Sequence, residues 1–322
     1  MDRVTPTAFP PPVVRTSDRP EWGHLPREVR DSAAAVLGSP VTGATGQAGG
    51  FSPGLAVRAV LADGRRVFLK GVAIDHPIHP VYAEEALIAR AMPAGAPVPR
   101  LLDTWQHGGW SLMAFQDIDG RHPDLSPRSA DIPTVLASLN SLPATVTPSP
   151  LPDAPPVATA LGDAMHGWAA LAEQNAGLDL WTTRHLPRLS AAERIWQTHS
   201  HGDTLLHSDL RPDNMLLTGD DCLIVDWAYL HQGAPWIDPA MLLPHFIRAG
   251  HSPAQAEELM AGLDSWKNVA QDALTSWAIA LTGYWNRSAR LRSPAKVPYL
   301  RGYQAEMAAI GRGWIEHRTG WH

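Results

Sequence analysis

The sequence contains a single cysteine among its 322 residues, Cys222, so no disulfide can form within one chain. Such a composition is typical of proteins from reducing compartments. No stretch approaches the ~20 uninterrupted apolar residues that a membrane-spanning helix needs. Residues 1–20 are rich in proline and contain no apolar run, which argues against a signal peptide. We therefore expect a soluble, cytoplasmic protein without a membrane partner.

Several common ligand-binding signatures are also missing. No Gly-x-x-x-x-Gly-Lys-Ser/Thr motif occurs, which excludes a P-loop. The 15 histidines are scattered and show no zinc-ligand spacing. The formal net charge is −6 and the basic residues form no stripe, which argues against a nucleic-acid partner. An acidic balance is compatible with a cationic ligand, and no motif favours a particular oligomeric state.

The composition is that of a globular protein with more than one core. Hydrophobic residues make up 44% and charged residues 18% of the chain, and the length fits two lobes. Short apolar segments with glycine turns dominate residues 41–116, whereas helical periodicity dominates the rest. We therefore predict an α+β protein with a strand-rich N-terminal lobe over residues 1–116, of which residues 1–21 form an extended tail. The helical C-terminal lobe is expected over residues 117–322.

The most informative stretch is residues 205–228, whose pattern predicts a loop, a strand, a turn and a second strand. Asp209 and Asn214 lie five residues apart on the loop, and Asp226 follows an apolar strand twelve residues after Asn214. A turn at residues 218–221 predicts a hairpin that brings Asn214 and Asp226 side by side. His-x-Asp-x-x-x-x-Asn, followed by an apolar strand that ends in Asp, is the spacing of a kinase catalytic loop and metal-binding turn.

This arrangement suits phosphoryl transfer, which needs positioned groups and charge neutralisation more than covalent chemistry. Asp209 would accept or orient the proton of an attacking hydroxyl group. Asn214 and Asp226 offer hard oxygen ligands, which suit magnesium held partly by nucleotide phosphates. A lone buried Asp more often only satisfies hydrogen bonds, but three ordered polar positions favour catalysis. We expect His207 to brace the loop rather than act as a base, and Asp238 to tie its helix to the loop.

The details resemble the aminoglycoside phosphotransferase family of small-molecule kinases more than they resemble protein kinases. The metal-binding turn reads Asp226-Trp227-Ala228 instead of Asp-Phe-Gly, and Met215-Leu216-Leu217 follows Asn214. Ser208 stands where a glycine is usual, and we expect its small side chain to preserve the geometry. The resemblance extends from about Trp22 to Trp321. It implies a two-lobed protein-kinase-like fold and an enzyme that uses Mg²⁺ and ATP or GTP to phosphorylate an alcohol group of a small molecule.

The resemblance also assigns the nucleotide-binding residues. Lys70 ends an apolar strand and would hold the α- and β-phosphates, paired with a glutamate of the next helix, although a lysine there can also extend to solvent. Adjacent helical residues point about 100° apart, so only one of Glu84 and Glu85 can face Lys70, and the family pattern selects Glu85. Adenine would bind to the backbone of the hinge at Ala114, Phe115 and Gln116. The loop that covers the phosphates corresponds to a glycine-rich segment with Gly49, Gly50, Phe51 and Ser52.

The sequence constrains the acceptor less than the nucleotide. We expect the acceptor between Asp209 and the C-terminal helices, which carry the polar or aromatic residues Asp264, Asp272, Glu306, Trp277, Tyr284 and Trp285. The aromatic residues are expected to pack the lobe, and the carboxylates would suit an amine-bearing acceptor such as an aminoglycoside or amino sugar. The alternative is a metabolite kinase for a neutral sugar or amino alcohol, because these motifs do not separate a resistance enzyme from a metabolic one.

Two other classes of protein share parts of this pattern. A catalytically silent nucleotide-binding scaffold has no need of Lys70, Asp209, Asn214 and Asp226 together, so their joint presence argues against it. A protein kinase needs an ordered activation segment, and neither an Asp-Phe-Gly nor an Ala-Pro-Glu motif is found.

Overall fold

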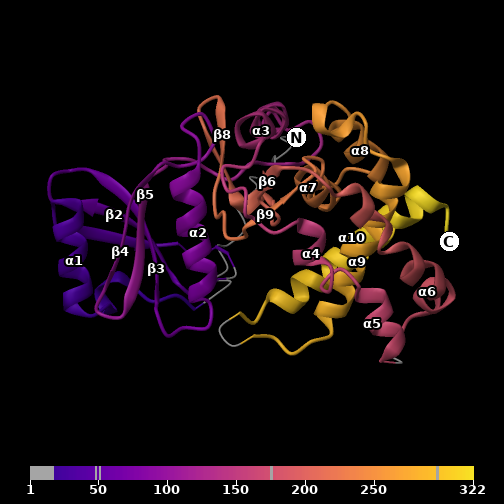
Figure 1. Cartoon of the computed structure of the whole chain (residues 1–322), viewed down its shortest axis with the longest axis horizontal. Coiled ribbons are helices and arrows are strands. Elements are labelled where there is room, and N and C mark those ends of the chain that lie inside the picture. The colour runs from indigo at the N-terminus through magenta and orange to yellow at the C-terminus, as the bar shows by residue number, and fades with distance from the viewer. Residues whose placement is uncertain (1–17, 48, 51, 175–176, 295–296) are drawn as a thin grey trace, which may run out of the picture.

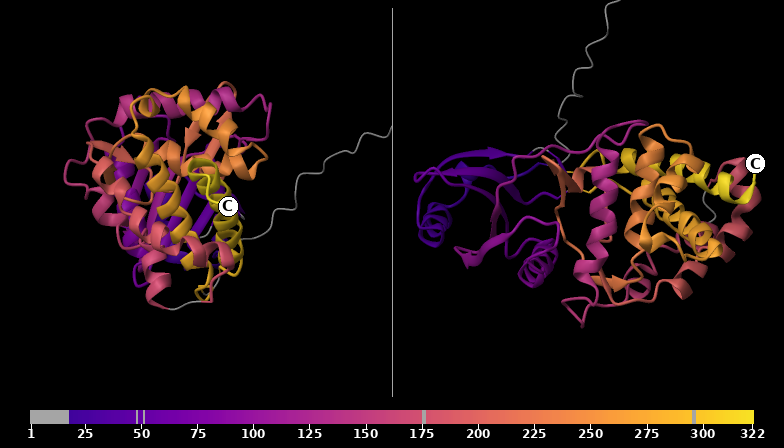
Figure 2. Two further views of the ribbon diagram at one scale, coloured as in Figure 1. Left: turned by 90° about the vertical axis from the view of Figure 1, so that its right-hand side faces the viewer. Right: turned by 90° about the horizontal axis from the view of Figure 1, so that it is seen from above.

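The computed structural model describes residues 18–47, 49–50, 52–174, 177–294 and 297–322. These residues form a strand-rich part and a helical part that lie side by side along the long axis (Figures 1 and 2). The last strand of the first part ends at Gln116, and the next regular element along the chain belongs to the second part. We propose residue 116 as the boundary between the two lobes. None of the described helices combines the length and the apolar character that crossing a membrane would require.

The strand-rich part is built on a five-stranded antiparallel sheet. Two short strands flank the glycine-rich segment, as the sequence predicts. Helix α2 (His79–Ala91) connects β3 to β4 and stands between the sheet and the helical part (Figure 1). The spatial order of the strands is β1 (Val41–Gly46), β2 (Leu55–Leu61), β3 (Arg66–Ala73), β5 (Trp110–Gln116) and β4 (Leu101–His107).

The two faces of this sheet pack against different helices. Helix α1 (Arg27–Leu37) contributes Val29 to one hydrophobic cluster, which also contains Leu69 of β3. Helix α2 packs on the other face, where Val72 of β3 belongs to its cluster. Because successive side chains of a strand alternate between faces, Lys70 points to the same side as Val72. The alternation therefore places Lys70 beside the helix that carries Glu85.

The helical part contains the remaining regular elements. Its α-helices are α3 (Ile132–Val146), α4 (Val157–Leu161), α5 (Gly167–Glu173), α6 (Leu180–Ala192), α7 (Ile237–Arg248), α8 (Pro253–Ala261), α9 (Gln271–Ala289) and α10 (Leu300–Thr319). Two small antiparallel sheets pair β6 (Thr204–Leu206) with β9 (His231–Gly233) and β7 (Met215–Thr218) with β8 (Asp221–Ile224). The helical part also contains the short 3₁₀ helices η2 (Ile195–His199), η3 (Pro212–Asn214) and η4 (Asp264–Trp266), whereas η1 (Trp22–His24) precedes α1 in the strand-rich part.

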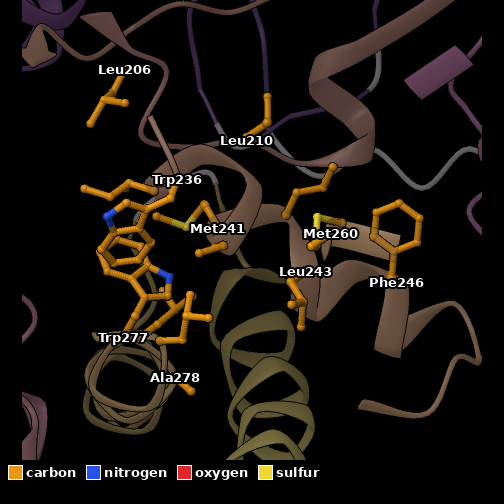
Figure 3. Close-up of a cluster of buried hydrophobic side chains, with 14 of the residues drawn as sticks. Leu206, Leu210, Trp236, Met241, Leu243, Phe246, Met260, Trp277 and Ala278 are labelled. Carbon is orange, nitrogen blue, oxygen red and sulfur yellow. The ribbon is translucent and has the colours of Figure 1, made fainter. Parts of the chain in front are cut away.

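A large hydrophobic cluster fills the helical part. Trp277 of α9 has no exposed surface and meets Trp196 and Trp236 nearly edge-on, with ring centroids 5.0 and 5.7 Å away. Leu206, the last residue of β6, and Phe246 of α7 belong to the same cluster (Figure 3). The loop after β6 therefore leaves from a fixed point in the core, and α7 is fixed beside it.

The start of α3 differs from the sequence-based expectation. The sequence pattern predicts a helix over residues 128–142, but α3 begins at Ile132 and continues to Val146 with Pro143 inside it. Arg128 has a positive φ of 71°, which is incompatible with a right-handed helix at that residue. The proline lies near the end of the helix, where one lost hydrogen bond disturbs few residues.

The sequence pattern also predicts one helix over residues 157–175, but the structure divides this stretch into α4 and α5. The cause is the buried side chain of Glu193, whose two oxygens each accept a 2.9 Å hydrogen bond from the backbone N–H groups of Trp168 and Ala169. These bonds satisfy the free N–H groups of a new helix start. A third helix is predicted from the sequence over residues 184–198. In the structure this helix, α6, begins earlier, at Leu180, because Asp179 caps it, and it ends at Ala192.

We predict that Gly283→Ala destabilises the protein, because the helices α5 and α9 approach closely at this residue. A Cβ atom at Gly283 would lie 2.8 Å from two atoms of the Trp168 indole. Such overpacking typically costs ~1–3 kcal/mol. The matched control is Gly313→Ala in α10, where a Cβ atom meets nothing within 4 Å. Thermal denaturation should show a lower Tm for the first variant and an equal or higher Tm for the second; equal losses in both would contradict the close contact.

Candidate active site

The loop after β6 is held by the side chain of Asp238 at the start of α7. Its Oδ2 accepts a 2.8 Å hydrogen bond from the backbone N–H of His207, and its Oδ1 accepts one of 2.9 Å from that of Ser208. Ser208 has a φ of 62°, in the left-handed region that favours glycine. The buried carboxylate therefore stabilises a backbone conformation that serine adopts only at a cost.

His207 braces the same loop from inside. Its Nε2 lies 2.9 Å from the carbonyl oxygen of Val225, and its Nδ1 lies 3.3 Å from the backbone nitrogen of Asp209. With the proton on Nε2, the ring donates to the first and accepts from the second. The ring is fully buried and meets Trp227 at 4.9 Å between centroids. Both ring nitrogens are engaged, so His207 positions the loop.

Asn214 and Asp226 lie at the open end of the hairpin formed by β7 and β8. Met215 pairs with Ile224 in the register, and the backbone N–H of Val225 donates a 2.9 Å hydrogen bond to the carbonyl oxygen of Asn214. The side-chain Nδ2 of Asn214 donates a 2.9 Å hydrogen bond to the carbonyl oxygen of Asp209. Since its nitrogen is used in this way, the Oδ1 atom of Asn214 faces away from the loop backbone.

Lys70 joins three elements of the structure. Its Nζ lies 2.6 Å from Oε1 of Glu85 on α2 and 2.6 Å from Oδ1 of Asp226, which follows β8. Glu85 is buried, whereas the neighbouring Glu84 is exposed. Asp226 has a φ of 66°, so its backbone is also in the left-handed region. A strand, a helix and a hairpin therefore meet at one ammonium group.

The charges of this group shift the pKa values of its members. Burial alone would lower the pKa of Lys70, but the negative charges of Asp226 and Glu85 outweigh burial and raise it. Desolvation would raise the pKa of Asp226, but the ammonium of Lys70 lowers it to about 2. Burial dominates at Glu85 and raises its pKa in spite of Lys70. Lys70 and Asp226 are therefore both charged at neutral pH.

Asp209 lies on the same loop beside a buried arginine. Burial raises the pKa of Asp209, and the charge of Arg211 opposes that rise. The Nη2 atom of Arg211 lies 3.7 Å from Oδ2 of Asp209 and 3.1 Å from Oδ2 of Asp213. A carboxylate with a raised pKa is a stronger proton acceptor than an ordinary one, and the charge of Arg211 favours its ionised form.

A cavity of about 270 Å³ separates the sheet from this hairpin. Phe68, Phe115 and Ile224 contribute apolar walls, and Lys70 and Asp226 contribute charge. Such a mixture of apolar walls with a few convergent polar groups is typical of small-molecule sites. The residues predicted from the sequence that line it are Gly49, Gly50, Ser52, Lys70, Glu85, Phe115, Gln116, Asn214 and Asp226.

Two described residues among the predicted ones, Ala114 and Asp209, do not line this cavity. Phe51 lies outside the described residues. Ala114 has no exposed surface, because it sits inside β5 between Leu69 of β3 and Asp103 of β4. The backbone groups of Ala114 belong to the sheet, because both neighbouring strands pair with it. Residues 115–118 line the cavity instead, so the hinge contact predicted at Ala114 moves to these residues. Asp209 also lies outside the cavity lining, as expected for a residue that faces the acceptor.

Two parts of the site are absent from the sequence-based candidates. Arg58 donates to both carboxylate oxygens of Asp117, at 2.7 and 2.9 Å, and Nε of Arg66 lies 2.9 Å from Oδ2. Burial alone would raise the pKa of Asp117, but the two arginines hold it below its usual value. Arg19, which precedes α1, also lines the cavity. Isolated arginines on a strand or tail carry no signal in the sequence, because their partners lie far along the chain.

Tyrosines surround the side of Asp209 that faces the C-terminal helices. Burial, and then the charge of Asp209, raises the pKa of Tyr229 and of Tyr284. The pKa of Tyr303 is raised by burial against the opposing charge of Arg211, and Asp209 adds to the rise. The three phenols are therefore neutral at physiological pH. Trp277 and Trp285 are buried in the core, as expected for packing residues, whereas Tyr284 is close enough for the charge of Asp209 to act on it.

The three carboxylates proposed for the acceptor each have a basic partner in the structure. Asp264 bonds to Lys267 and Asn140 on the surface. Asp272 lies in the first turn of α9, about 18 Å along the helix axis from Tyr284 at 1.5 Å per residue. Glu306 accepts two 2.9 Å hydrogen bonds from Arg248. Asp264 and Asp272 therefore bond to residues at other places on the surface, Glu306 is occupied by Arg248, and a carboxylate-lined acceptor site stays a prediction.

Asn214 and Asp226 are the side chains that could hold a metal ion. No group of three or more His, Cys, Asp or Glu side chains suited to a metal ion occurs in the described part of the chain. One ionised carboxylate and one amide oxygen leave most positions of an octahedral ion to water or phosphate oxygens. This donor set fits Mg²⁺, which is usually bound through one or two carboxylates together with substrate phosphates.

Both the sequence and the structure of this chain are similar to those of known phosphotransferases and kinases. The sequence matches the model of the phosphotransferase enzyme family over residues 48–273. Among curated proteins, none matches the sequence.

Solved kinases share the fold at low sequence identity. A choline/ethanolamine kinase family protein from Mesorhizobium loti has a TM-score of 0.59 and 19% identity, with 89% of this chain and 94% of the other covered. Spectinomycin phosphotransferase, in complex with ADP and spectinomycin, has a TM-score of 0.57 and 12% identity, with 88% and 96% covered. Amicoumacin kinase, in complex with AMP-PNP and Ca²⁺, has a TM-score of 0.52 and 14% identity, with 86% and 88% covered. The predicted α+β, two-lobed fold is confirmed.

We predict that Asp226→Asn lowers the stability of the folded protein in a pH-dependent way. The folded-state pKa of about 2 lies below the ordinary value of 3.8, so the carboxylate stabilises the fold above pH 4 and loses this effect as the pH falls toward 2. Because the side chain is 36% exposed, we discount the effect for solvent screening to ~1 kcal/mol. Thermal denaturation should show a lower Tm than wild type at pH 7 and a smaller difference at pH 3. A difference that grows toward acidic pH would contradict the ion pair.

Proposed function

The chain belongs to the phosphotransferase enzyme family, in agreement with the resemblance to aminoglycoside phosphotransferases, and we propose that it transfers the terminal phosphoryl group of ATP or GTP to a hydroxyl group of a small molecule. The observation that carries this proposal is the meeting of Lys70 with Glu85 and Asp226 beside the Asp209 loop. A lysine held by two carboxylates at the edge of a cavity is suited to bind phosphate oxygens.

The cavity between the sheet and the hairpin would hold the nucleotide. Apolar side chains of both walls, Phe68 and Ile224 among them, suit the flat face of a nucleobase. The backbone of residues 115–118 would form hydrogen bonds with the edge of the nucleobase. Both adenine and guanine carry donors and acceptors on that edge. Lys70 would contact the phosphates, and Gly49, Gly50 and Ser52 would cover them. Asn214 and Asp226 would hold Mg²⁺, which neutralises charge on the phosphates during transfer.

Asp209 would act on the acceptor. The acceptor oxygen gives its proton to the Asp209 carboxylate and forms a bond to the terminal phosphorus atom, while the bond from phosphorus to the bridging oxygen breaks. A nucleoside diphosphate then leaves with the electron pair of that bond. His207, Arg211 and Asp238 do not touch the reacting atoms in this scheme; they hold the Asp209 loop and its charge in place.

The charges near Asp209 favour a neutral acceptor over an aminoglycoside or amino sugar. Asp213 shares Arg211 with Asp209, and Glu306 is paired with Arg248, so the two arginines offset part of the carboxylate charge in this region. Phenols such as Tyr229 hydrogen-bond to hydroxyl groups and pack against apolar faces. Because they are neutral, they provide no negative charge for a cation. We therefore favour the alternative of a neutral, hydroxylated metabolite with an apolar face over a polycation, which needs uncompensated negative charge.

We predict that Asp209→Asn lowers kcat by ~10²–10⁴-fold, the usual contribution of a positioned proton acceptor. Nucleotide affinity should stay within about twofold of wild type, since Asp209 does not line the nucleotide cavity. Stability at pH 7 should not fall, because a raised folded-state pKa means that ionisation of Asp209 opposes folding. The matched control is Asp220→Asn at the exposed hairpin turn. Wild-type turnover in a folded Asp209→Asn protein would remove Asp209 from the mechanism.

A panel of acceptors tests the substrate class. Neutral sugars and glycosides, amino alcohols, aminoglycosides and anionic metabolites are each incubated with ATP or GTP and Mg²⁺. Nucleoside diphosphate release is measured, and product mass identifies the phosphorylated compound. We expect the highest kcat/KM for a neutral hydroxylated compound. Efficient turnover of an aminoglycoside alone would contradict the neutral class, whereas the absence of turnover for every hydroxylated compound would count against the kinase activity.

A further inference from the structure

We infer that Arg19, in the segment before α1, is a phosphate-binding residue of the nucleotide site. The inference rests on the proposed function, because it assumes that the cavity binds a nucleotide. Arg19 lies 51 positions before Lys70 in the sequence, and both side chains line the same cavity. None of the sequence motifs that predict the other residues of the site includes Arg19.

The guanidinium group of Arg19 connects the two ends of the glycine-rich segment. Its Nη2 donates a 2.8 Å hydrogen bond to the carbonyl oxygen of Gly49, and its Nη1 donates one of 3.1 Å to that of Gly54. Gly50 has a φ of 82°, and a Cβ atom at this residue would lie 2.8 Å from Nη2. The absence of a side chain at Gly50 therefore leaves the space that the guanidinium group occupies.

Arg19 differs from the other cationic side chains of the cavity in its partners. Lys70 is bonded to Glu85 and Asp226. Arg58 is bonded to Asp117, and Arg121 to Asp131. Among the described residues, the hydrogen-bond partners of Arg19 are the two carbonyl oxygens, which carry no net charge. Its positive charge is therefore available to an anion in the cavity.

The position of Arg19 is close enough for its charge to act on the Lys70 group. The charge of Arg19 contributes to lowering the pKa of Glu85 and of Tyr82, against the larger effect of burial. The hydroxyl of Tyr82 lies 2.9 Å from Oγ of Ser52, at the base of the glycine-rich segment. Lys70 Nζ lies 5.6 Å from the centroid of the Tyr82 ring, so Arg19 and Lys70 both line the cavity and both act on this tyrosine.

The chemistry of the guanidinium group suits a polyphosphate. It presents five N–H donors in a planar fork that matches phosphate oxygens. Two of these donors are used by the carbonyl oxygens of Gly49 and Gly54, and the buried Nε of Arg19 has no hydrogen-bond partner within the described ranges. A nucleotide phosphate beneath the glycine-rich segment would give this side chain its missing counter-charge. The bonds to the segment would hold the fork in place for that contact.

The test compares Arg19→Gln in the full-length chain with wild type. Calorimetry measures Kd for MgATP, MgGTP, MgADP and the free nucleosides adenosine and guanosine. We expect Arg19→Gln to weaken the preferred triphosphate and diphosphate by about tenfold or more, since one charge-assisted hydrogen bond is lost. The matching nucleoside should bind within about twofold of wild type. Arg19→Lys, which keeps the charge, should recover part of the affinity.

The control variant is Arg27→Gln, at an arginine on the first turn of α1 whose side chain is 88% exposed. It makes the same change of charge and should leave every Kd unchanged. Equal loss for nucleotide and nucleoside in Arg19→Gln would show that Arg19 only shapes the segment, and it would overturn the inference. Unchanged triphosphate affinity would overturn it as well. A wild-type protein that binds no nucleotide would contradict both the proposed function and this inference, a result distinct from the other two.

Discussion

The ion pairs of Lys70 are the interaction on which the candidate site depends. One ammonium group, 2.6 Å from each of two carboxylate oxygens, joins the central strand of the sheet, the helix that covers it and the turn after β8. Removing Lys70 would leave Glu85 and Asp226 as two neighbouring negative charges without a partner, and an unpaired buried charge is costly. The two parts of the chain are therefore coupled at the point where the nucleotide phosphates would bind.

The other half of the site is organised by a second carboxylate. Asp238 bonds to two consecutive backbone N–H groups, and His207 fixes the loop against the hairpin. Two residues of the site, Ser208 and Asp226, are held at positive φ without being glycine. Backbone strain of this kind persists only where surrounding contacts impose it, and it often marks functional positions. At Ser208 the fold maintains it through α7, in which residues 237–246 are buried.

The sequence was most informative where the site is local. Asp209, Asn214 and Asp226 lie within one loop and one hairpin, so spacing alone predicted their approach, and strand alternation explains why Lys70 faces α2. Glu85 required a resemblance, since the sequence alone does not distinguish it from Glu84. Other features depend on distant contacts and could not be derived. Asp264 and Asp272 share the helical lobe with Asp209 but lie elsewhere, and Arg19 reaches the cavity from a segment with no recognisable motif. Similarly, the division of one expected helix into α4 and α5 depended on Glu193, which is distant in sequence.

A crystal structure with a non-hydrolysable ATP or GTP analogue and Mg²⁺ tests the central claim most directly. The account predicts phosphate oxygens within hydrogen-bond distance of Lys70 Nζ, with Glu85 still bonded to that lysine. It also predicts a metal ion bound to Oδ1 of Asn214 and to the carboxylate of Asp226, and the nucleobase between the walls of the cavity. A nucleotide whose phosphates lie away from Lys70, or a metal ion that contacts neither Asn214 nor Asp226, would contradict it.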